Sequence, residues 1–316
     1  MKFSAPARID LAGGTLDVPP LCFLVEHAKT LNLAIDLRVT IEATREWEGV
    51  ALDEGKPQPF ASMPLYEKAF AYFGAPEALG LRVTSDIPRA SGLGGSSSLL
   101  VALVNLVQSL ENDHSFDKHK VLKWVTVLEH RLLGKPAGTQ DAIGAIHGGL
   151  SSISYELGMP TRQALPVPAF LTERPLILAY SPIQHHSGIN NWAVVKAACE
   201  GEARTLRTLH ALADNAHDLE SVLLSGDARD FFACMQREAA LRQELCPQIL
   251  TEDMAAFATR FKDALACKAC GAGGGGCMLA YGPDYDLDEI KSTALENNLQ
   301  VFEVKPDMRG CERVDP

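Results

Sequence analysis

The sequence predicts an α+β protein built in two halves. Strand and turn patterns fill the first third of the 316 residues, and helical, charge-rich patterns fill the middle. Between them, residues 159–175 are punctuated by prolines, which is typical of a connection between domains. We therefore expect one domain over residues 1–170 and a second over residues 171–316.

The first half is predicted to contain strands followed by two helices. Apolar and polar residues alternate, or nearly alternate, over residues 7–11, 32–41 and 81–87, which predicts three strands. Residues 97–111 are strongly apolar and long enough for a buried helix. Helical spacing continues over residues 118–133 and stops at a glycine, and a further strand is expected at residues 148–155.

The second half is predicted to start with a short buried strand at residues 176–180. Residues 190–261 are mostly helical in pattern. Beyond them we expect an apolar strand at 277–281, a helix near 287–297 and a strand at 299–304. No internal repeat interrupts this order.

The composition excludes several classes of protein. Lys and Arg number 29 and Asp and Glu 40, so the net charge is −11, which disfavours nucleic acid or an anionic membrane as partner because either needs a basic face. No signal peptide is expected, and the longest apolar stretch is too short to span a bilayer. The 8 cysteines include a lone C-x-x-C at Cys267–Cys270 with no second pair for zinc. We therefore expect reduced thiols in a cytoplasmic protein.

Glycines gather in three distant clusters, at residues 12–14, 91–95 and 271–276. In the middle cluster a strand ends at Pro88, a glycine loop follows, and serines open a helix. Such a loop turns backbone N–H groups toward one point, and the helix N-terminus adds a positive dipole. This pattern predicts an anion cradle for a triphosphate, or else a helix entry without a ligand. It is not a Walker A loop, because no lysine follows the serines.

The other two clusters indicate different roles. Gly271–Gly276 contains G-x-G-x-x-G, but a strand-like run follows it, so we reject a dinucleotide-binding motif and expect a close backbone approach to a ligand or another loop. The first cluster follows a strand that carries Arg8 and leads to Asp17. The Asp17 carboxylate suits sugar hydroxyls, although the pattern by itself favours an aspartate that caps a turn.

Together the three clusters resemble the motifs of the GHMP small-molecule kinases, the superfamily of galactokinase, homoserine kinase, mevalonate kinase and phosphomevalonate kinase. Residues 6–17, 88–98 and 268–279 match, in order, the family's N-terminal motif, its phosphate loop P-x-x-x-G-L-G-S-S and its glycine-rich third motif. The chain is most similar to the sugar-1-kinases of the D-glycero-D-manno-heptose 7-phosphate kinase group, with relatives acting on fucose. Two positions depart from the pattern: Gly95 stands where the loop usually has serine, and Thr15-Leu16-Asp17 where the heptose kinases tend to have Gly-Thr-Asp.

The resemblance implies a two-domain GHMP kinase fold, with a mixed α/β N-terminal domain and a ferredoxin-like α+β C-terminal domain. It implies ATP-dependent phosphorylation of the anomeric hydroxyl of a sugar or sugar phosphate, with D-glycero-D-manno-heptose 7-phosphate as the leading acceptor. ATP and Mg²⁺ are the implied cofactors, and a homodimer is compatible with the family. Galactose, fucose or mevalonate as acceptor, and a catalytically silent sensor of ATP and sugar, remain open.

The resemblance also assigns roles to residues. Asp141 would accept or orient the proton of the attacking hydroxyl, and Arg8 would favour the ionised form of Asp141 and stabilise charge on the transferring phosphoryl group. Without the resemblance, Asp141 would be an N-cap for a helix beginning at Ala142, and Arg8 a surface strand residue.

The remaining implied residues form three sets. The acceptor would contact Asp17, Gly13, Gly14, Ser187 and Gly188. ATP would contact Ser91, Gly92, Leu93, Gly94, Gly95, Ser96, Ser97, Gly273 and Gly274. Mg²⁺ would be held by Ser96 and Glu129. For a phosphate on the acceptor the candidates Arg38, His185 and Lys305 are too dispersed in the sequence to choose among.

Overall fold

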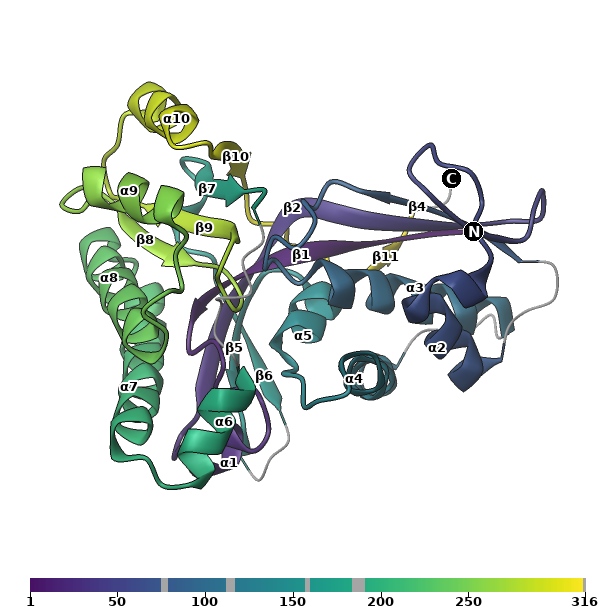
Figure 1. The fold of residues 1–316 in the computed structure, drawn as a ribbon, viewed down its shortest axis with the longest axis horizontal. Coiled ribbons are helices and arrows are strands. Elements are labelled where there is room, and N and C mark those ends of the chain that lie inside the picture. The colour runs from purple at the N-terminus through teal and green to yellow at the C-terminus, as the bar shows by residue number, and fades with distance from the viewer. Residues whose placement is uncertain (75–78, 112–116, 157–159, 184–190, 315–316) are drawn as a thin grey trace.

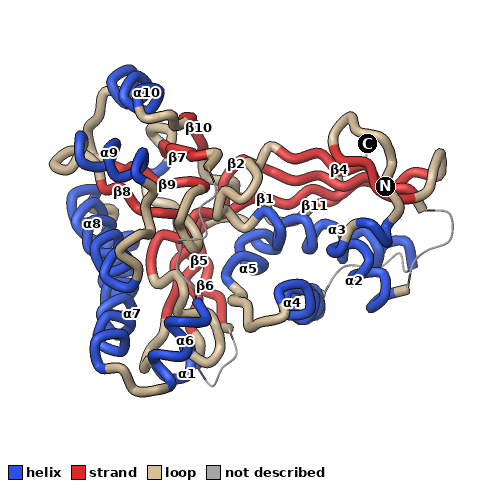
Figure 2. The backbone as a smooth tube through the Cα atoms, viewed as in Figure 1, coloured by secondary structure: helices blue, strands red, loops and turns tan. Residues whose placement is uncertain are grey.

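Two β-sheets organise the chain, one of seven strands and one of four. The computed structural model describes all residues except 75–78, 112–116, 157–159, 184–190 and 315–316. In Figure 1 the long strands β1 and β2 run across the molecule, with α2 to α5 below them on the right and α7 and α8 on the left. The smaller sheet lies at the upper left, under α9 and α10 (Figure 2).

The larger sheet branches at its longest strand. Its strands are β1 (Lys2–Ala12), β2 (Lys29–Thr44), β3 (Gly49–Leu52), β4 (Gly80–Ser85), β5 (Leu150–Ser154), β6 (Thr161–Leu165) and β11 (Glu312–Arg313). Strand β2 has 16 residues, so one end pairs with β4 while the other pairs with β5. All neighbours are antiparallel except β3 and β4.

Helices cover this sheet and bury its apolar face. The helices of this part of the chain are α1 (Leu21–Leu24), α2 (Pro64–Phe73), α3 (Gly95–Glu111), α4 (Lys118–Leu133) and α5 (Gln140–His147), with short 3₁₀ turns at Phe60–Ser62 and Ala169–Leu171. Helix α3 packs on β1 and β2, and its apolar residues from Leu100 to Val107 belong to the main core. The predicted bounds of α4 are confirmed, because Asp117 caps its first turn and Gly134 ends it in the left-handed region at φ 63°.

The smaller sheet has the order β10-β7-β9-β8, and all its neighbours are antiparallel. Its strands are β7 (Leu176–Ser181), β8 (Ala266–Ala269), β9 (Gly276–Tyr281) and β10 (Gln300–Val304). Helices α6 (Asn191–Cys199), α7 (Ala203–Ser225), α8 (Ala228–Leu245) and α9 (Glu252–Arg260) connect β7 to β8, and α10 (Leu287–Glu296) connects β9 to β10. This β-α-β-β-α-β order confirms the ferredoxin-like expectation, with an enlarged first connection.

The end of the chain returns to the larger sheet. Strand β11 pairs with β1, and Arg38 of β2 forms an ion pair with the buried Asp307. The larger sheet therefore contains a strand that lies beyond residue 171. The domain division at residues 170 and 171 stays a prediction; it falls between β6 of the larger sheet and β7 of the smaller one.

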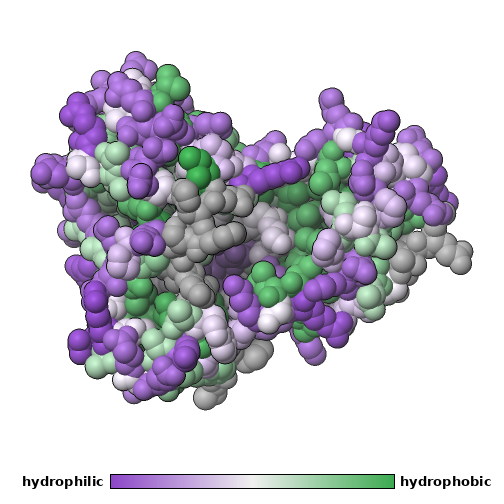
Figure 3. Space-filling view, viewed as in Figure 1, coloured by the Kyte–Doolittle hydropathy of each residue, from purple (hydrophilic) through white to green (hydrophobic). Residues whose placement is uncertain are grey.

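The surface is hollowed in the middle of the face shown in Figure 3, and hydrophobic residues gather along the right-hand side of this hollow. Within the described ranges, no helix has the length and apolar character needed to cross a membrane.

Candidate active site

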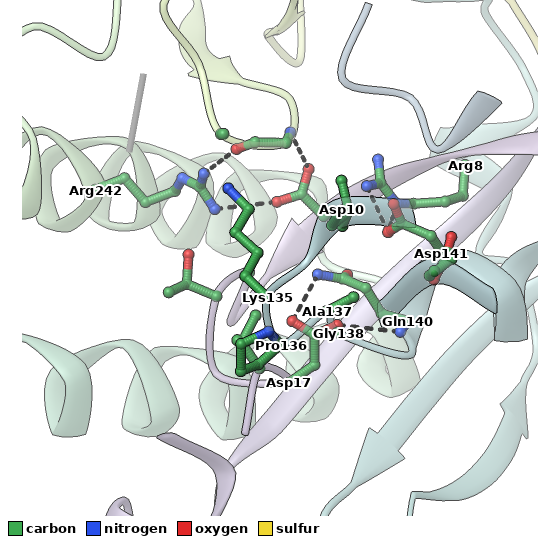
Figure 4. A pocket seen from close by; sticks show the side chains of 17 residues that line it. Arg8, Asp10, Asp17, Lys135, Pro136, Ala137, Gly138, Gln140, Asp141 and Arg242 are labelled. Carbon is green, nitrogen blue, oxygen red and sulfur yellow. Dashed lines mark hydrogen bonds and ion pairs between the residues drawn. The ribbon is translucent and has the colours of Figure 1, made fainter. Parts of the chain in front are cut away.

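Two cavities meet at Asp141. The small cavity, of about 250 Å³, lies among β1, the loop after it, the segment joining α4 to α5, helix α8 and the third glycine cluster (Figure 4). The large cavity, of about 870 Å³, is lined by residues 85–92 and 94–97, by apolar residues of β2 and β4, and by residues of the smaller sheet. Asp141 lines both, so a group bound in one cavity can approach a group bound in the other at this carboxylate.

The glycine loop forms one wall of the large cavity. Gly92 and Gly94 have φ of 74° and 77°, a region that favours glycine. A Cβ on Gly92 would lie 2.4 Å from the Cys270 carbonyl oxygen, so the loop also requires glycine for its close approach to the third cluster. Helix α3 begins at Gly95, and the free N–H groups of its first turn lie at the cavity wall.

Most of the residues predicted to bind ATP lie on this cavity. They are Ser91, Gly92, Gly94, Gly95, Ser96 and Ser97. Leu93 differs, because its side chain is buried in the core and its carbonyl accepts the Arg8 N–H at 3.0 Å. The cavity is also lined by the apolar side chains of Val39, Leu52, Leu65, Val83, Leu99 and Phe302. An anion cradle beside apolar walls fits the triphosphate and the base of ATP.

Asp141 forms an ion pair with Arg8 through one oxygen only. Helix α5 begins at Gln140 with Thr139 as N-cap, so Asp141 lies in the first turn and the N-cap alternative is wrong. Asp141 Oδ1 accepts from Arg8 Nε at 2.8 Å and from Nη2 at 2.6 Å. Asp141 Oδ2 has no hydrogen bond within the described part of the chain, and it lies 3.4 Å from the position of a Cβ on Gly94. One oxygen therefore faces the glycine loop unpaired.

Arg8 connects the loop to the carboxylate. It is 4% exposed, and its Nη1 donates to the Gly92 carbonyl at 2.7 Å. Burial lowers the pKa of Arg8, but the charges of Asp141 and Asp10 outweigh burial and hold this pKa above its ordinary value. Arg8 is thus a fixed cation in the wall of the small cavity, and the prediction of a surface strand residue is wrong.

Asp17 lines the small cavity and also caps α5. Its Oδ2 accepts the Gln140 backbone N–H at 3.1 Å, and its Oδ1 accepts from Gln140 Nε2 at 3.4 Å. A Cβ on Gly138 would lie 1.8 Å from Asp17 Oδ2, so this contact needs glycine. Burial, together with the nearby charge of Asp141, raises the pKa of Asp17 to about 6.

The two glycines of the first cluster are separated by the structure. Gly14 lines the small cavity, and its contact with the acceptor stays a prediction. Gly13 does not line it: the Gly13 N–H donates to Glu238 Oε1 at 3.0 Å, and a Cβ would lie 1.9 Å from the Lys29 carbonyl oxygen. Gly13 therefore serves the close packing of backbone segments.

Glu129 contacts Ser97 and not Ser96. The Ser97 hydroxyl donates to Glu129 Oε1 and both side chains are buried, whereas Ser96 is exposed. Successive helix residues lie about 100° apart, so only one of two neighbouring serines can face α4. Burial and, to a smaller extent, the nearby charge of Asp141 raise the pKa of Glu129 to about 8. The hydrogen bond from Ser97 acts in the opposite direction.

A hydroxyl and a carboxylate oxygen at the junction of the cavities fit a hard divalent cation that keeps several waters. Across the described residues, no group of three or more His, Cys, Asp and Glu side chains is arranged to hold a metal ion. A cation here would therefore also need oxygens from a bound nucleotide.

The third glycine cluster packs on the glycine loop. The Cys277 N–H donates to the Ser91 carbonyl at 2.7 Å, and a Cβ on Gly276 would lie 2.6 Å from the Ala90 carbonyl oxygen. Gly273 and Gly274, predicted to contact ATP, instead pack against Ile249 and line neither cavity. The predicted acceptor residues Ser187 and Gly188 lie outside the described residues.

The sequence analysis missed a buried cluster of charges behind the site. Asp10 Oδ2 lies 2.8 Å from Lys268 Nζ and 3.2 Å from Arg242 Nη1, and Asp10 Oδ1 accepts the Gly271 N–H at 3.2 Å. Burial would raise the pKa of Asp10, but Lys268 and Arg242 lower it to about 2. Arg8 and Asp10 are two residues apart in a strand and therefore share one face, and this spacing could have indicated from the sequence that Asp10 lies near Arg8. Nothing in the local sequence marks Arg242.

A glycine loop at a helix start, beside an arginine–aspartate pair and between two cavities, is the arrangement of a small-molecule phosphotransferase. Residues 63–149 match the family model of the GHMP kinases N-terminal domain. This match confirms the resemblance to the GHMP kinases seen in the three glycine clusters.

Relatives and solved structures agree with this family. The chain is 25% identical to a bifunctional fucokinase/GDP-fucose pyrophosphorylase of Arabidopsis thaliana over 96% of its own length, and it spans 32% of that protein. It is 21% identical to the D-glycero-alpha-D-manno-heptose 7-phosphate kinase of Campylobacter jejuni over 89% of each chain. The crystal structure of a D-glycero-D-manno-heptose 1-phosphate kinase from Bacteroides thetaiotaomicron has the same fold, with a TM-score of 0.75, 18% identity and coverage of 100% of this chain and 99% of that one.

Proposed function

We propose that the protein transfers the terminal phosphoryl group of ATP to the anomeric hydroxyl of a sugar or sugar phosphate. D-glycero-D-manno-heptose 7-phosphate is the leading acceptor, supported by the kinase of Campylobacter jejuni that matches most of the chain. The observation that carries the proposal is the position of Asp141, where the small cavity meets the large cavity. In this proposal the sugar occupies the small cavity and ATP the large one.

Asp141 Oδ2 is the proton acceptor in this scheme. As the sugar oxygen forms its bond to the γ-phosphorus, the bond from that phosphorus to the bridging oxygen of ADP breaks, and the sugar hydroxyl proton moves to Asp141 Oδ2. Arg8 holds Oδ1 with two hydrogen bonds, which fixes the orientation of the carboxylate and favours its ionised form. Positioning and charge neutralisation supply most of the rate in phosphoryl transfer, so the alignment of Asp141 matters alongside its basicity.

Arg8 also fixes the distance between the loop and Asp141. Its guanidinium bonds to the Gly92 carbonyl and to Asp141 at once, while its backbone N–H bonds to the Leu93 carbonyl. A displacement of the loop would therefore move the carboxylate with it. The same cation is placed to stabilise negative charge on the group in transfer.

Ser97 and Glu129 are the residues that would hold Mg²⁺, a revision of the predicted pair of Ser96 and Glu129. A magnesium ion bound there would neutralise charge on the nucleotide phosphates. Because burial keeps the pKa of Glu129 near 8, its carboxyl group must lose a proton before it can bind the cation.

Release of ADP from ATP and Mg²⁺, measured against a panel of sugars, sugar 7-phosphates, galactose, fucose and mevalonate, tests the reaction. We expect turnover with one class of acceptor. Turnover only with mevalonate would overturn the sugar acceptor, and tight ATP binding with no turnover would identify a sensor.

Gly94→Val tests the nucleotide site. A valine here would require a strained φ and would enter the space beside Asp141, so ATP binding should be lost. Gly201→Val is the matched control, because Gly201 also has a positive φ, of 76°, but nothing lies within 4 Å of its added Cβ. Unchanged ATP affinity in Gly94→Val would show that the loop does not bind the nucleotide.

A further inference from the structure

The small cavity has a positively charged end opposite Asp141. Arg242 of α8 and Lys135, from the segment between α4 and α5, both line it. In Figure 4 the Lys135 side chain extends toward Asp10 and Arg242, while Arg8 and Asp141 lie at the other side of the view. This end belongs to neither the reacting carboxylate nor the glycine loop.

Arg242 has one N–H group without an acceptor. Its Nη1 bonds to Asp10 and its Nη2 to the Gly271 carbonyl, which fix the guanidinium. The Nε is buried and has no hydrogen-bond partner, although the whole residue is only 2% exposed. A buried donor without an acceptor costs free energy, so this atom indicates a place where a ligand oxygen would be favourable.

Lys135 is exposed, and no ion pair with it occurs among the residues that the structure describes. The lining of the same cavity contains the carboxyl groups of Asp10, Asp17, Glu129 and Asp141. All four already have partners within the protein: Asp10 pairs with Lys268 and Arg242, Asp17 with Gln140, Glu129 with Ser97, and Asp141 with Arg8. The ammonium group therefore remains available, and its flexible stem lets it approach a bound anion.

A second unpartnered atom lies in the same lining. Gln140 Oε1 is buried without a hydrogen-bond donor, although Gln140 Nε2 bonds to Asp17. An acceptor of this kind suits a hydroxyl group. The cavity thus combines cations at one end with a hydroxyl-binding position near the start of α5.

We propose that Lys135 and Arg242 bind an anionic group of the acceptor, a phosphate or a carboxylate carried away from the reacting hydroxyl, and that they select anionic sugars over neutral ones. This inference rests on the proposed function and deepens it. Both residues line the small cavity, where the proposed function places the acceptor, and neither lines the large cavity proposed for the nucleotide. Arg38, a candidate from the sequence, is bound to Asp307 and lines neither cavity.

Matched sugar pairs test the proposal. ADP release is measured for D-mannose against D-mannose 6-phosphate and for D-glucose against D-glucuronate. In the unaltered protein kcat/KM should be higher for the anionic member of at least one pair. A preference for the phosphate alone, or for the carboxylate alone, tells which anion the subsite accepts. Equal values within both pairs would overturn the proposal.

Lys135→Met tests the residue, with Lys123→Met as its control. Lys123 is an exposed lysine of α4 that lines neither cavity. Loss of one charge-assisted contact should raise KM for the anionic sugar about tenfold, leave kcat unchanged, and leave the neutral sugar unaffected. An equal rise in KM for the neutral sugars would show that Lys135 does not act on the anionic group of the acceptor, and it would overturn the proposal.

Calorimetric titration of the same sugar pairs without ATP keeps the two proposals apart. If no sugar releases ADP, the proposed reaction fails, but tighter binding of an anionic sugar that is lost in Lys135→Met would still support the subsite. Equal binding of charged and neutral sugars would remove it, whatever the outcome of the kinase assay.

Discussion

Two arginine–aspartate pairs lie on the wall of the small cavity, and they differ in how far solvent reaches them. The side chains of Arg242 and Asp10 are 2% and 1% exposed, whereas those of Arg8 and Asp141 are 5% and 30% exposed. Strand β1 supplies one member of each pair, since Arg8 and Asp10 are two residues apart and point to the same face.

The difference shows how one kind of ion pair can serve two purposes. Both Asp10 oxygens are engaged, by Lys268 and Arg242 on one side and by the Gly271 N–H on the other. The pair therefore connects β1, α8 and the third glycine cluster. Asp141 commits only Oδ1 to Arg8 and leaves Oδ2 toward the glycine loop. We interpret the Asp10–Arg242 pair, with both carboxylate oxygens engaged (the closed pair), as the one that holds these segments together and fixes the Arg242 guanidinium. We interpret the Asp141–Arg8 pair, with Oδ2 unpaired (the open pair), as the reactive one.

Asp141→Asn tests the open pair and should have the largest effect. The amide keeps an oxygen for Arg8 but is not a base, so kcat should fall by about 10²- to 10⁴-fold. ATP affinity and melting temperature should change little. Steady-state kinetics and a thermal melt measure both effects. An unchanged kcat would remove Asp141 from the mechanism.

Asp10→Asn tests the closed pair and should act on stability. The variant removes the carboxylate that forms ion pairs with the buried Lys268 and Arg242, which should lower the free energy of unfolding by about 3–5 kcal/mol. Urea titration measures the loss. Adding Lys268→Met to this variant should recover part of it, because one uncompensated charge is then removed. An unchanged free energy of unfolding in Asp10→Asn would show that these ion pairs do not stabilise the contact between β1, α8 and the third glycine cluster.

Glu129→Gln tests a carboxyl group of the same cavity whose pKa is raised mainly by burial. The folded pKa of about 8 lies above the ordinary value of 4.5, so the folded state retains a proton that the unfolded state loses. Stability of the unaltered protein should therefore fall as pH rises from 4.5 to 8, by about 2 kcal/mol between pH 6 and pH 8 relative to the variant. Calorimetry at both pH values measures this. If the stability of both proteins changed equally between the two pH values, Glu129 would not be a buried neutral carboxyl group.

Asp17→Asn should give the smallest change. The amide oxygen can still accept the Gln140 N–H, so the cap of α5 survives and the free energy of unfolding at pH 7 should change by no more than about 1 kcal/mol. The KM for the acceptor should rise about tenfold, since one charged acceptor of hydroxyl protons is lost. A fall in kcat with unchanged KM would instead assign Asp17 to the alignment of Asp141.

The local features of the site could be predicted because the residues that cause them are adjacent in sequence. A proline, the glycines after it and the serines that follow predicted a loop and a helix start within residues 88–97, where the structure has Gly92 and Gly94 at positive φ and α3 beginning at Gly95. The capping residues around α4 predicted its bounds. The resemblance added the roles of Asp141 and Arg8, which the residues alone did not favour.

What the sequence by itself determined, therefore, is the α+β class, the order of its main elements and the position of the glycine loop. Only the tertiary structure decided that Ser97 rather than Ser96 meets Glu129, that Gly13 packs on Lys29, and that Lys268 and Arg242 surround Asp10. The reason is physical: turns, caps and helical periods depend on neighbouring residues, whereas the partners of a buried charge come from segments that packing brings together.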